Sequence, residues 1–174
     1  MYKILTFIFK VLHLHLFMAN RIKGNFTCGK SFLFKNKGDL SIGDGVVFRN
    51  FVNILIEKNG YLEIGSNVFI NNYSSFNVCK RLTIGNDCLF GEGVKIYDHN
   101  HIYRTSSLVR NAPLITKDIV IGNNVWICSN VVICAGVVIG NNCVIGANSV
   151  VFKDIPENSV YCCDGSMRQI DLRK

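Results

Sequence analysis

The sequence predicts an all-β fold, a parallel β-helix of about five triangular coils with an extruded loop and a short N-terminal helix. Two observations predict it: an aliphatic residue returns every six positions, and glycine or asparagine often follows it. The composition excludes a disordered chain, because 49% of the residues are hydrophobic and only 18% are charged. With 174 residues, we expect one domain with short appendages.

The six-residue period is clearest toward the C-terminus. There, an aliphatic residue occupies every sixth position without a slip: Ile121, Ile127, Ile133, Ile139, Ile145 and Val151. Blocks of three hexads, or eighteen residues, start at positions 42, 64, 84, 121 and 139. Three short strands per block predict a triangular coil, and coils stack at the ~4.8 Å spacing of paired strands. An antiparallel domain would alternate with period two instead.

The hexads also predict which residues are inside and which are at the corners. The period-six aliphatic residue should point into the prism. Glycine and asparagine follow it because each corner needs residues that tolerate positive φ. The β-helix is assigned to residues 24–160, with a loop at 102–119 and a C-terminal tail at 161–174.

The first twenty residues are apolar but are interrupted by Lys10, so they fall short of the ~20-residue span of a transmembrane helix. They also lack a convincing cleavage site for a signal peptide. Polar residues recur at helical spacing, which predicts an amphipathic helix over residues 1–23. It would pack on the body of the protein or lie on a membrane surface with Arg21 and Lys23 facing lipid; a retained signal anchor is a third alternative.

Charge and cysteine content limit the partners. The net charge of +7 suits an anionic ligand or surface, but without a Lys/Arg cluster it does not indicate nucleic acid. The eight cysteines show neither paired C-x2-C motifs nor a histidine at zinc-ligand spacing, so we expect reduced structural thiols and no metal. Reduced thiols favour the cytoplasm, where a lipid-bound helix would hold the protein at the inner face of the membrane.

Several segments resemble the hexapeptide-repeat acyltransferases, especially galactoside and maltose O-acetyltransferases and enzymes that decorate surface polysaccharides. They are IGSNVFINN (64–72), IGNDCLFGEGVKIYDHNH (84–101), the run at 121–160, and Arg168. The resemblance implies left-handed coils, acetyl-CoA as co-substrate with no permanently bound cofactor, a saccharide acceptor and a homotrimer.

The hexad period stops at His101 and resumes near residue 121, and a long loop on a rigid scaffold is usually functional. By the family register of YDHNH, His101 would be the catalytic base. Asn71, thirty residues earlier, matches the acceptor-binding asparagine, and His99 would contact the acceptor. Asp98 would orient the imidazole of His101, unless a backbone carbonyl does so.

The same resemblance assigns the donor site. Trp126 would form a wall of it, the Ser129 N–H would face the thioester carbonyl, and Ala147 would line the pantetheine slot. Lys153 and Arg168 would lie near the phosphates of coenzyme A. Two departures affect the acceptor and the adenine end of the donor: Ile102 stands where sugar acetyltransferases carry proline, and DGSMR (164–168) replaces their closing motif.

The sequence therefore predicts an acetyl-CoA-dependent O-acetyltransferase that acts on a sugar hydroxyl of a surface polysaccharide or its precursor. Two alternatives stay open, N-acetylation of a nucleotide-linked amino sugar and a non-catalytic β-helix that serves as a binding module. Asn71 and His101 belong to different hexads and therefore to different faces of one prism. A neighbouring chain around a threefold axis would bring them together.

Overall fold

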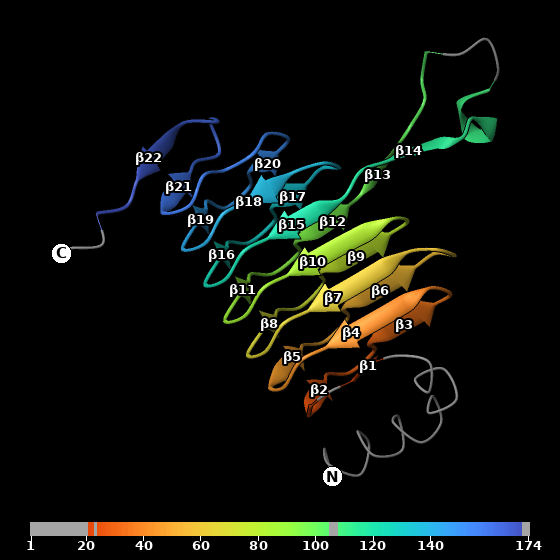
Figure 1. Cartoon of the computed structure of the whole chain (residues 1–174), viewed down its shortest axis with the longest axis horizontal. Coiled ribbons are helices and arrows are strands. Elements are labelled where there is room, and N and C mark those ends of the chain that lie inside the picture. The colour runs from red at the N-terminus through yellow and green to blue at the C-terminus, as the bar shows by residue number, and fades with distance from the viewer. Residues whose placement is uncertain (1–20, 23, 105–107, 172–174) are drawn as a thin grey trace.

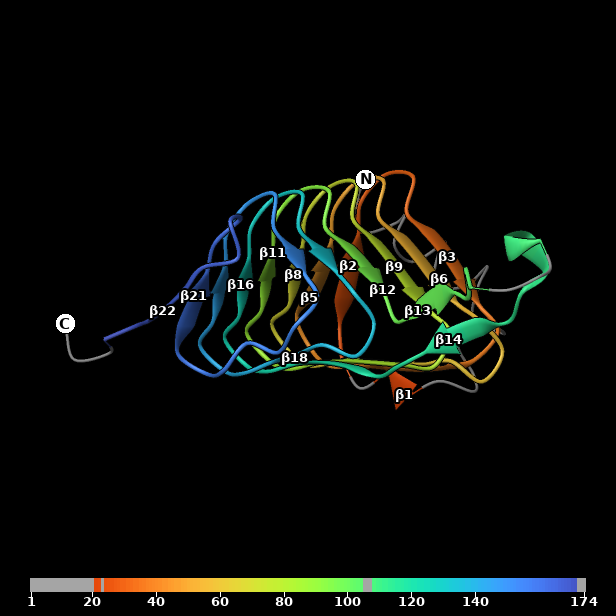
Figure 2. The same cartoon turned by 90° about the horizontal axis from the view of Figure 1, so that it is seen from above.

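The chain winds into a parallel β-helix with a triangular cross-section, seen from the side in Figure 1 and from above in Figure 2. This computed structural model describes residues 21–22, 24–104 and 108–171. The helix expected over residues 1–23 lies outside the described residues, except that Arg21 and Ile22 form a strand that pairs with the next coil.

Three parallel sheets form the walls of the prism. Wall 1 consists of β1 (Arg21–Ile22), β4 (Asp39–Ile42), β7 (Tyr61–Ile64), β10 (Arg81–Ile84), β15 (Ile119–Ile121) and β18 (Val138–Ile139). Wall 2 consists of β2 (Phe26–Cys28), β5 (Val46–Phe48), β8 (Phe69–Ile70), β11 (Leu89–Phe90), β16 (Trp126–Ile127), β19 (Val144–Ile145) and β21 (Ser159–Tyr161), and the antiparallel β22 (Met167–Gln169) ends it. Wall 3 consists of β3 (Leu33–Asn36), β6 (Asn53–Ile56), β9 (Ser75–Val78), β12 (Lys95–Tyr97), β17 (Val132–Ile133) and β20 (Val150–Val151).

Equivalent hexad positions stack directly on one another. In wall 1, Ile42 pairs with Ile64, Ile64 with Ile84, and Ile84 with Ile121. All of these side chains are buried, as are the other period-six residues of the repeats. The predicted fold class and the inward direction of the hexad residues are confirmed.

The predicted number of coils is too low. Wall 2 has seven parallel strands in the described chain, so the prism has about seven turns rather than five. One additional coil precedes residue 42, and its hexad positions are Ile22, Cys28 and Phe34, which pair with Ile42, Phe48 and Ile54. A further partial turn follows the coil that starts at residue 139, where Ile155 and Tyr161 pair with Ile139 and Ile145. The period of six therefore continues to the first strand. It was missed there because Ile22 falls in the segment predicted as a helix and a cysteine occupies the next hexad position.

The corners hold the residues with positive φ, as the pattern predicts. Asn67, Asp87, Asn124 and Asn142 adopt φ of 53–58° in successive coils of the corner between walls 1 and 2. Glycine is required beside them by stacking: a Cβ on Gly85 would lie 2.7 Å from the backbone of Gly122 in the next coil. Such a distance leaves no room for a side chain.

One excursion interrupts the stack between walls 3 and 1. Strands β13 (His99–His101) and β14 (Leu114–Thr116) pair antiparallel, and the 3₁₀ turn η1 (Val109–Asn111) lies beyond them. This hairpin projects from the upper part of the prism in Figure 1. The segment predicted as a loop at 102–119 therefore contains β14 and η1, and its last residue already belongs to wall 1.

Two further features concern the ends of the chain. The segment predicted as a tail, 161–174, begins in β21 and folds back as β22, so part of it extends wall 2. Among the described residues, no helix has the length and apolarity needed to cross a bilayer.

All eight cysteines are free thiols, and their burial predicts an order of reactivity. Cys88 and Cys143 are buried and donate to the carbonyls of Gly122 and Pro156, both at 3.1 Å. Burial raises the pKa of both thiols, so less reactive thiolate is present at neutral pH. We expect a thiol reagent at about pH 7.5 to label the exposed Cys163 first and these two last, and to label all eight cysteines after denaturation. Mass spectrometry of timed samples measures the order, and a native disulfide or rapid labelling of Cys88 would contradict it.

Candidate active site

A pocket of about 570 Å³ opens at the base of the hairpin. Its lining comes from the end of wall 3, from both hairpin strands and from the coil above: Tyr97, His99, Asn100, His101, Tyr103, Ile115, Lys117, Cys134 and Ala135. Residues 99 and 101 alternate with Asn100 in an extended strand, so their side chains share one face. The structure therefore places both predicted histidines in the same pocket.

Asp98 is fully buried at the start of the hairpin. Its carboxylate accepts the backbone N–H of Cys79 at 2.8 and 3.0 Å and that of Lys80 at 2.6 Å. Its Oδ1 also lies 3.2 Å from Nδ1 of His99. The carboxylate thus orients His99, whereas the sequence interpretation had it orient His101. The reason is local. The Asp98 side chain points into the corner and accepts backbone N–H groups of the coil below, and His99, the next residue, lies against the carboxylate.

The two imidazoles have different surroundings. His99 has a side chain only 20% exposed, lies beside Asp98 and meets the ring of Tyr97 edge-on at 6.1 Å. His101 is exposed, and its ring makes no hydrogen bond to any described residue. The pocket therefore contains one anchored histidine and one whose ring nitrogens are available to a ligand.

The structure also reveals a cluster that sequence spacing did not suggest. The ligating atoms of Cys79, Asp98 and His99 lie within 4.8 Å of one another because coil stacking brings together residues nineteen apart. These are residue types that bind metals. Here, however, backbone N–H groups and His99 occupy the carboxylate, and burial together with the charge of Asp98 raises the pKa of the Cys79 thiol. A neutral thiol is a poor metal ligand and a poor nucleophile. The cluster is therefore structural: the Asp98 carboxylate fastens the base of the hairpin to the coil below, and we call this contact the Asp98 lock.

A second group of predicted residues gathers at the corner between walls 2 and 3. Asn71 follows β8, Ser129 follows β16 and Ala147 follows β19, in coils that stack along this corner. Asn71 accepts the N–H of Asn72 at 2.9 Å. Trp126 projects from wall 2 just before the corner and is 49% exposed.

The two predicted cations lie at the C-terminal end of the prism. Lys153 donates to the carbonyl of Gly165 at 3.2 Å and sits 5.6 Å from the centre of the Tyr161 ring. Arg168 lies opposite Val160 in β22 and is exposed. Both therefore flank the β21–β22 turn and present positive charge to solvent.

Wall 3 separates the two groups within one chain. His99 and His101 leave from the corner between walls 3 and 1, whereas Asn71 and Ser129 lie at the corner between walls 2 and 3. The structure thus groups Trp126, Ser129 and Ala147 with Asn71, and groups the histidines with Asp98, but it does not bring the two groups together in one chain. Lys153 follows β20 of wall 3 and therefore lies on the histidines' side of that wall.

Comparisons with known proteins identify the family of this β-helix. Residues 118–153 match the family model described as bacterial transferase hexapeptide (six repeats). A galactoside acetyltransferase solved with coenzyme A is 30% identical, with a TM-score of 0.66 over 89% of this chain and 66% of that one. The chain belongs to the hexapeptide-repeat acyltransferases. The predicted family and enzyme class are confirmed.

Two further solved structures resemble this acyltransferase. The acetyltransferase VCA0836 of Vibrio cholerae, solved with acetyl coenzyme A, is 26% identical with a TM-score of 0.63, over 91% of this chain and 75% of that one. The N-acyltransferase AntD of Bacillus cereus, solved as a point mutant with dTDP and coenzyme A, has a TM-score of 0.78 over 95% of this chain and 89% of that one. At 20% identity, the likeness to AntD shows the fold alone. No curated protein matches the sequence.

The hydrogen bonds of Asp98 predict a structural cost of removing it. Asp98→Ala in the acyltransferase takes the acceptor from two backbone N–H groups at a buried carboxylate, so we expect a loss of about 1–3 kcal/mol in the free energy of unfolding. Asp118→Ala is the matched control, because that half-exposed carboxylate pairs with Lys80 at the surface and contributes under about 1 kcal/mol. Urea unfolding of both variants measures the difference, and equal losses would contradict the lock.

Proposed function

We propose that this protein is an acetyl-CoA-dependent O-acetyltransferase that acetylates a hydroxyl of a saccharide or its precursor, with His101 as general base. The exposed imidazole of His101, free of hydrogen bonds to the described residues, in a pocket on a hexapeptide-repeat scaffold is the observation that carries the proposal. Imidazole is suited to accept a hydroxyl proton near neutral pH.

The donor would lie along the corner between walls 2 and 3. The indole of Trp126 offers an exposed flat surface, and Ala147 has a side chain small enough to let a pantetheine arm pass. The N–H of Ser129 donates no hydrogen bond within the described chain, so it is available to the thioester oxygen. Lys153 and Arg168 supply cations for the phosphates of coenzyme A.

The reaction follows as a direct transfer. His101 removes the proton from the acceptor hydroxyl while that oxygen attacks the thioester carbonyl. The Ser129 N–H stabilises the negative oxygen of the tetrahedral intermediate. The intermediate collapses as the carbon–sulfur bond breaks, and the departing thiolate takes the proton from the imidazolium. Cys134 lines the same pocket, but burial raises its thiol pKa, which disfavours a covalent enzyme intermediate.

The separation of the two residue groups favours a homotrimer. Asn71 and the donor residues of one chain would face His101 of a neighbour across a threefold axis, because wall 3 keeps them apart within a chain. Closed rings are the common solution for such head-to-tail contacts. Each acetyl transfer would then use residues of two chains.

Two substitutions test the base. We expect His101→Ala to lower kcat about 10²–10⁴-fold while coenzyme A still binds, because Trp126 and Ser129 lie at another corner and the imidazole is not assigned to the donor. We expect His99→Ala to raise mainly the KM for the acceptor. The contact between Asp98 and His99 supports the rival assignment, in which the oriented imidazole is the base. Inactive His99→Ala with near-normal His101→Ala would establish that rival and overturn ours.

The acceptor screen for this test includes methyl β-galactoside, maltose and a nucleotide-linked amino sugar. Acetylation of the first two supports O-transfer, whereas acetylation of the amine alone supports the N-acetyltransferase alternative. Coenzyme A binding without transfer to any of them supports a binding module.

A mixing experiment tests the shared site. Asn71→Ala and His101→Ala chains, each inactive alone, should regain about a quarter of wild-type activity when refolded together, since three quarters of random trimers contain one intact site in three. Light scattering of the same mixture checks the trimeric mass. No recovery despite mixed trimers would place Asn71 and His101 in one chain's site.

A further inference from the structure

Two bulky aromatic residues occupy positions where the backbone favours asparagine or glycine. At the corner between walls 2 and 3, the positive-φ residues of successive coils are Ser31, Phe51, Tyr73, Gly93, Asn130 and Asn148. Phe51 and Tyr73 have φ of 59° and 60°, a conformation that bulky side chains rarely adopt. The coils above show that asparagine and glycine serve this corner, so turn geometry does not require aromatic rings there.

The two rings form an exposed stack, which we call the aromatic ladder. Their centroids are 5.0 Å apart with an angle of 3° between the ring planes, and the residues are 45% and 61% exposed. Phe51 covers one face of the Tyr73 ring. The next residue in this column is Gly93, which has no side chain to cover the other face, and the Tyr73 hydroxyl makes no hydrogen bond to the described residues.

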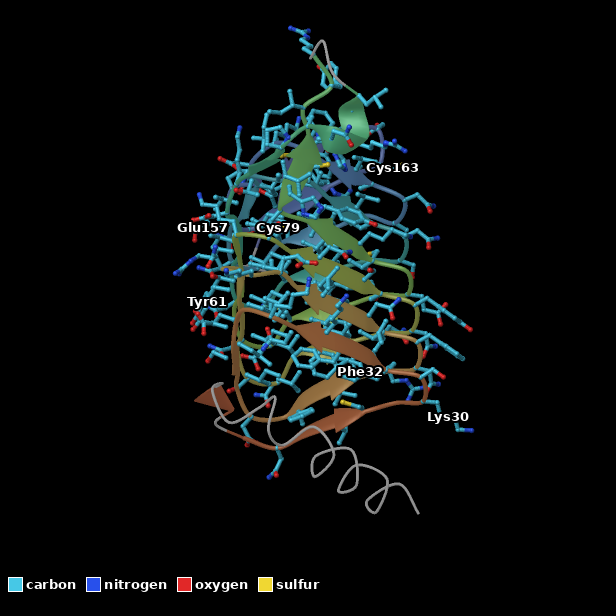
Figure 3. All side chains as sticks on the ribbon, turned by 90° about the vertical axis from the view of Figure 1, so that its right-hand side faces the viewer. Lys30, Phe32, Tyr61, Cys79, Glu157 and Cys163 are labelled. Atoms are coloured by element: carbon cyan, nitrogen blue, oxygen red, sulfur yellow. The ribbon has the colours of Figure 1, made fainter. Side chains whose placement is uncertain are left out.

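Polar groups run beside the ladder. Asn72 donates to the carboxylate of Glu92 at 2.9 Å and accepts the N–H of Asn50 at 3.1 Å. These three residues precede Tyr73, Gly93 and Phe51 in the sequence, so amide and carboxylate groups follow the rings coil by coil. Lys30 projects outward at the bottom of the same corner in Figure 3. A flat aromatic face beside hydrogen-bonding side chains suits a pyranose. The C–H bonds of the sugar stack on the electron-rich face of the aromatic ring, while the sugar hydroxyls form hydrogen bonds with the polar side chains.

The ladder also lies in line with the proposed reaction centre. Tyr73 is two residues from Asn71, and Ser129 directly precedes Asn130, which stands two coils above Tyr73 in the same column. At the ~4.8 Å spacing of the coils, the two points are about 10 Å apart, a distance that a short oligosaccharide spans. We infer that the aromatic ladder is a carbohydrate subsite, at which a sugar unit next to the acetylated one stacks on Tyr73. This inference rests on the proposed saccharide acceptor.

Replacement of the aromatic residues by asparagine separates the effect of the rings on binding from any effect on folding. Tyr73→Asn and Phe51→Asn install the residue that the corner uses in later coils, so we expect an unchanged or higher Tm. With the full-length protein, we expect Tyr73→Asn to weaken binding of maltotriose or lactose about tenfold and to raise the KM for the same sugar, with kcat and the Kd for coenzyme A unchanged. Tyr73→Phe is the matched control and should keep the affinity of the wild type.

The possible outcomes distinguish the carbohydrate subsite from the proposed function. Oligosaccharide binding that requires the Tyr73 ring, without any acetyl transfer, supports the subsite and overturns the proposed function. Acetyl transfer with equal KM for wild type and Tyr73→Asn overturns the subsite alone. A wild type that binds neither oligosaccharide, or a Tyr73→Asn variant with a changed mass in light scattering, also overturns it, and the change in mass would make the ladder an interface between copies.

Discussion

Hydrogen bonding between successive coils is the interaction on which the rest of this structure depends. Each inner strand of a wall pairs in register with the coil below and the coil above, so a residue at one hexad position meets its equivalent in the next coil. A parallel arrangement with this register repeats any property of one coil in the next: buried aliphatic columns form the core, and ladders of asparagine bridge the corners, as from Asn86 to Asn123 and on to Asn141. A side chain that does not fit its column therefore affects two neighbours as well as its own coil.

The groups of the proposed active site lie where this regularity is interrupted. The hairpin of β13 and β14 leaves the stack between walls 3 and 1, and the buried carboxylate of Asp98 ties its first residues to the coil below through the N–H groups of Cys79 and Lys80. These hydrogen bonds give the long connection a rigid base. One side of the pocket is therefore fixed, with His99 held against Asp98 and His101 exposed to solvent.

At the second interruption the backbone keeps its course, and only the residue types change. The corner between walls 2 and 3 keeps its backbone geometry through six coils, yet it holds aromatic rings in two of them and small or amide residues above. Different groups therefore follow one another along this corner: the rings of Phe51 and Tyr73 beside amide side chains in the N-terminal coils, and the N–H of Ser129 in a later coil. In the proposed reaction, an extended donor and an extended acceptor approach this corner from opposite ends.

The sequence by itself determined the class of fold, the inward residues and the positive-φ corners, because a repeat of six imposes the same environment on every copy, and local residue preferences suffice to read it. It also determined the family. The first coil was missed because Ile22 was assigned to the N-terminal helix and a cysteine fills the hexad position of Cys28. Only the tertiary structure decided that Asp98 holds His99, that Cys79 joins them, and that Phe51 stacks on Tyr73. Each of these contacts joins side chains whose orientation is set by the corner or by the neighbouring coil, so linear spacing carries no record of it.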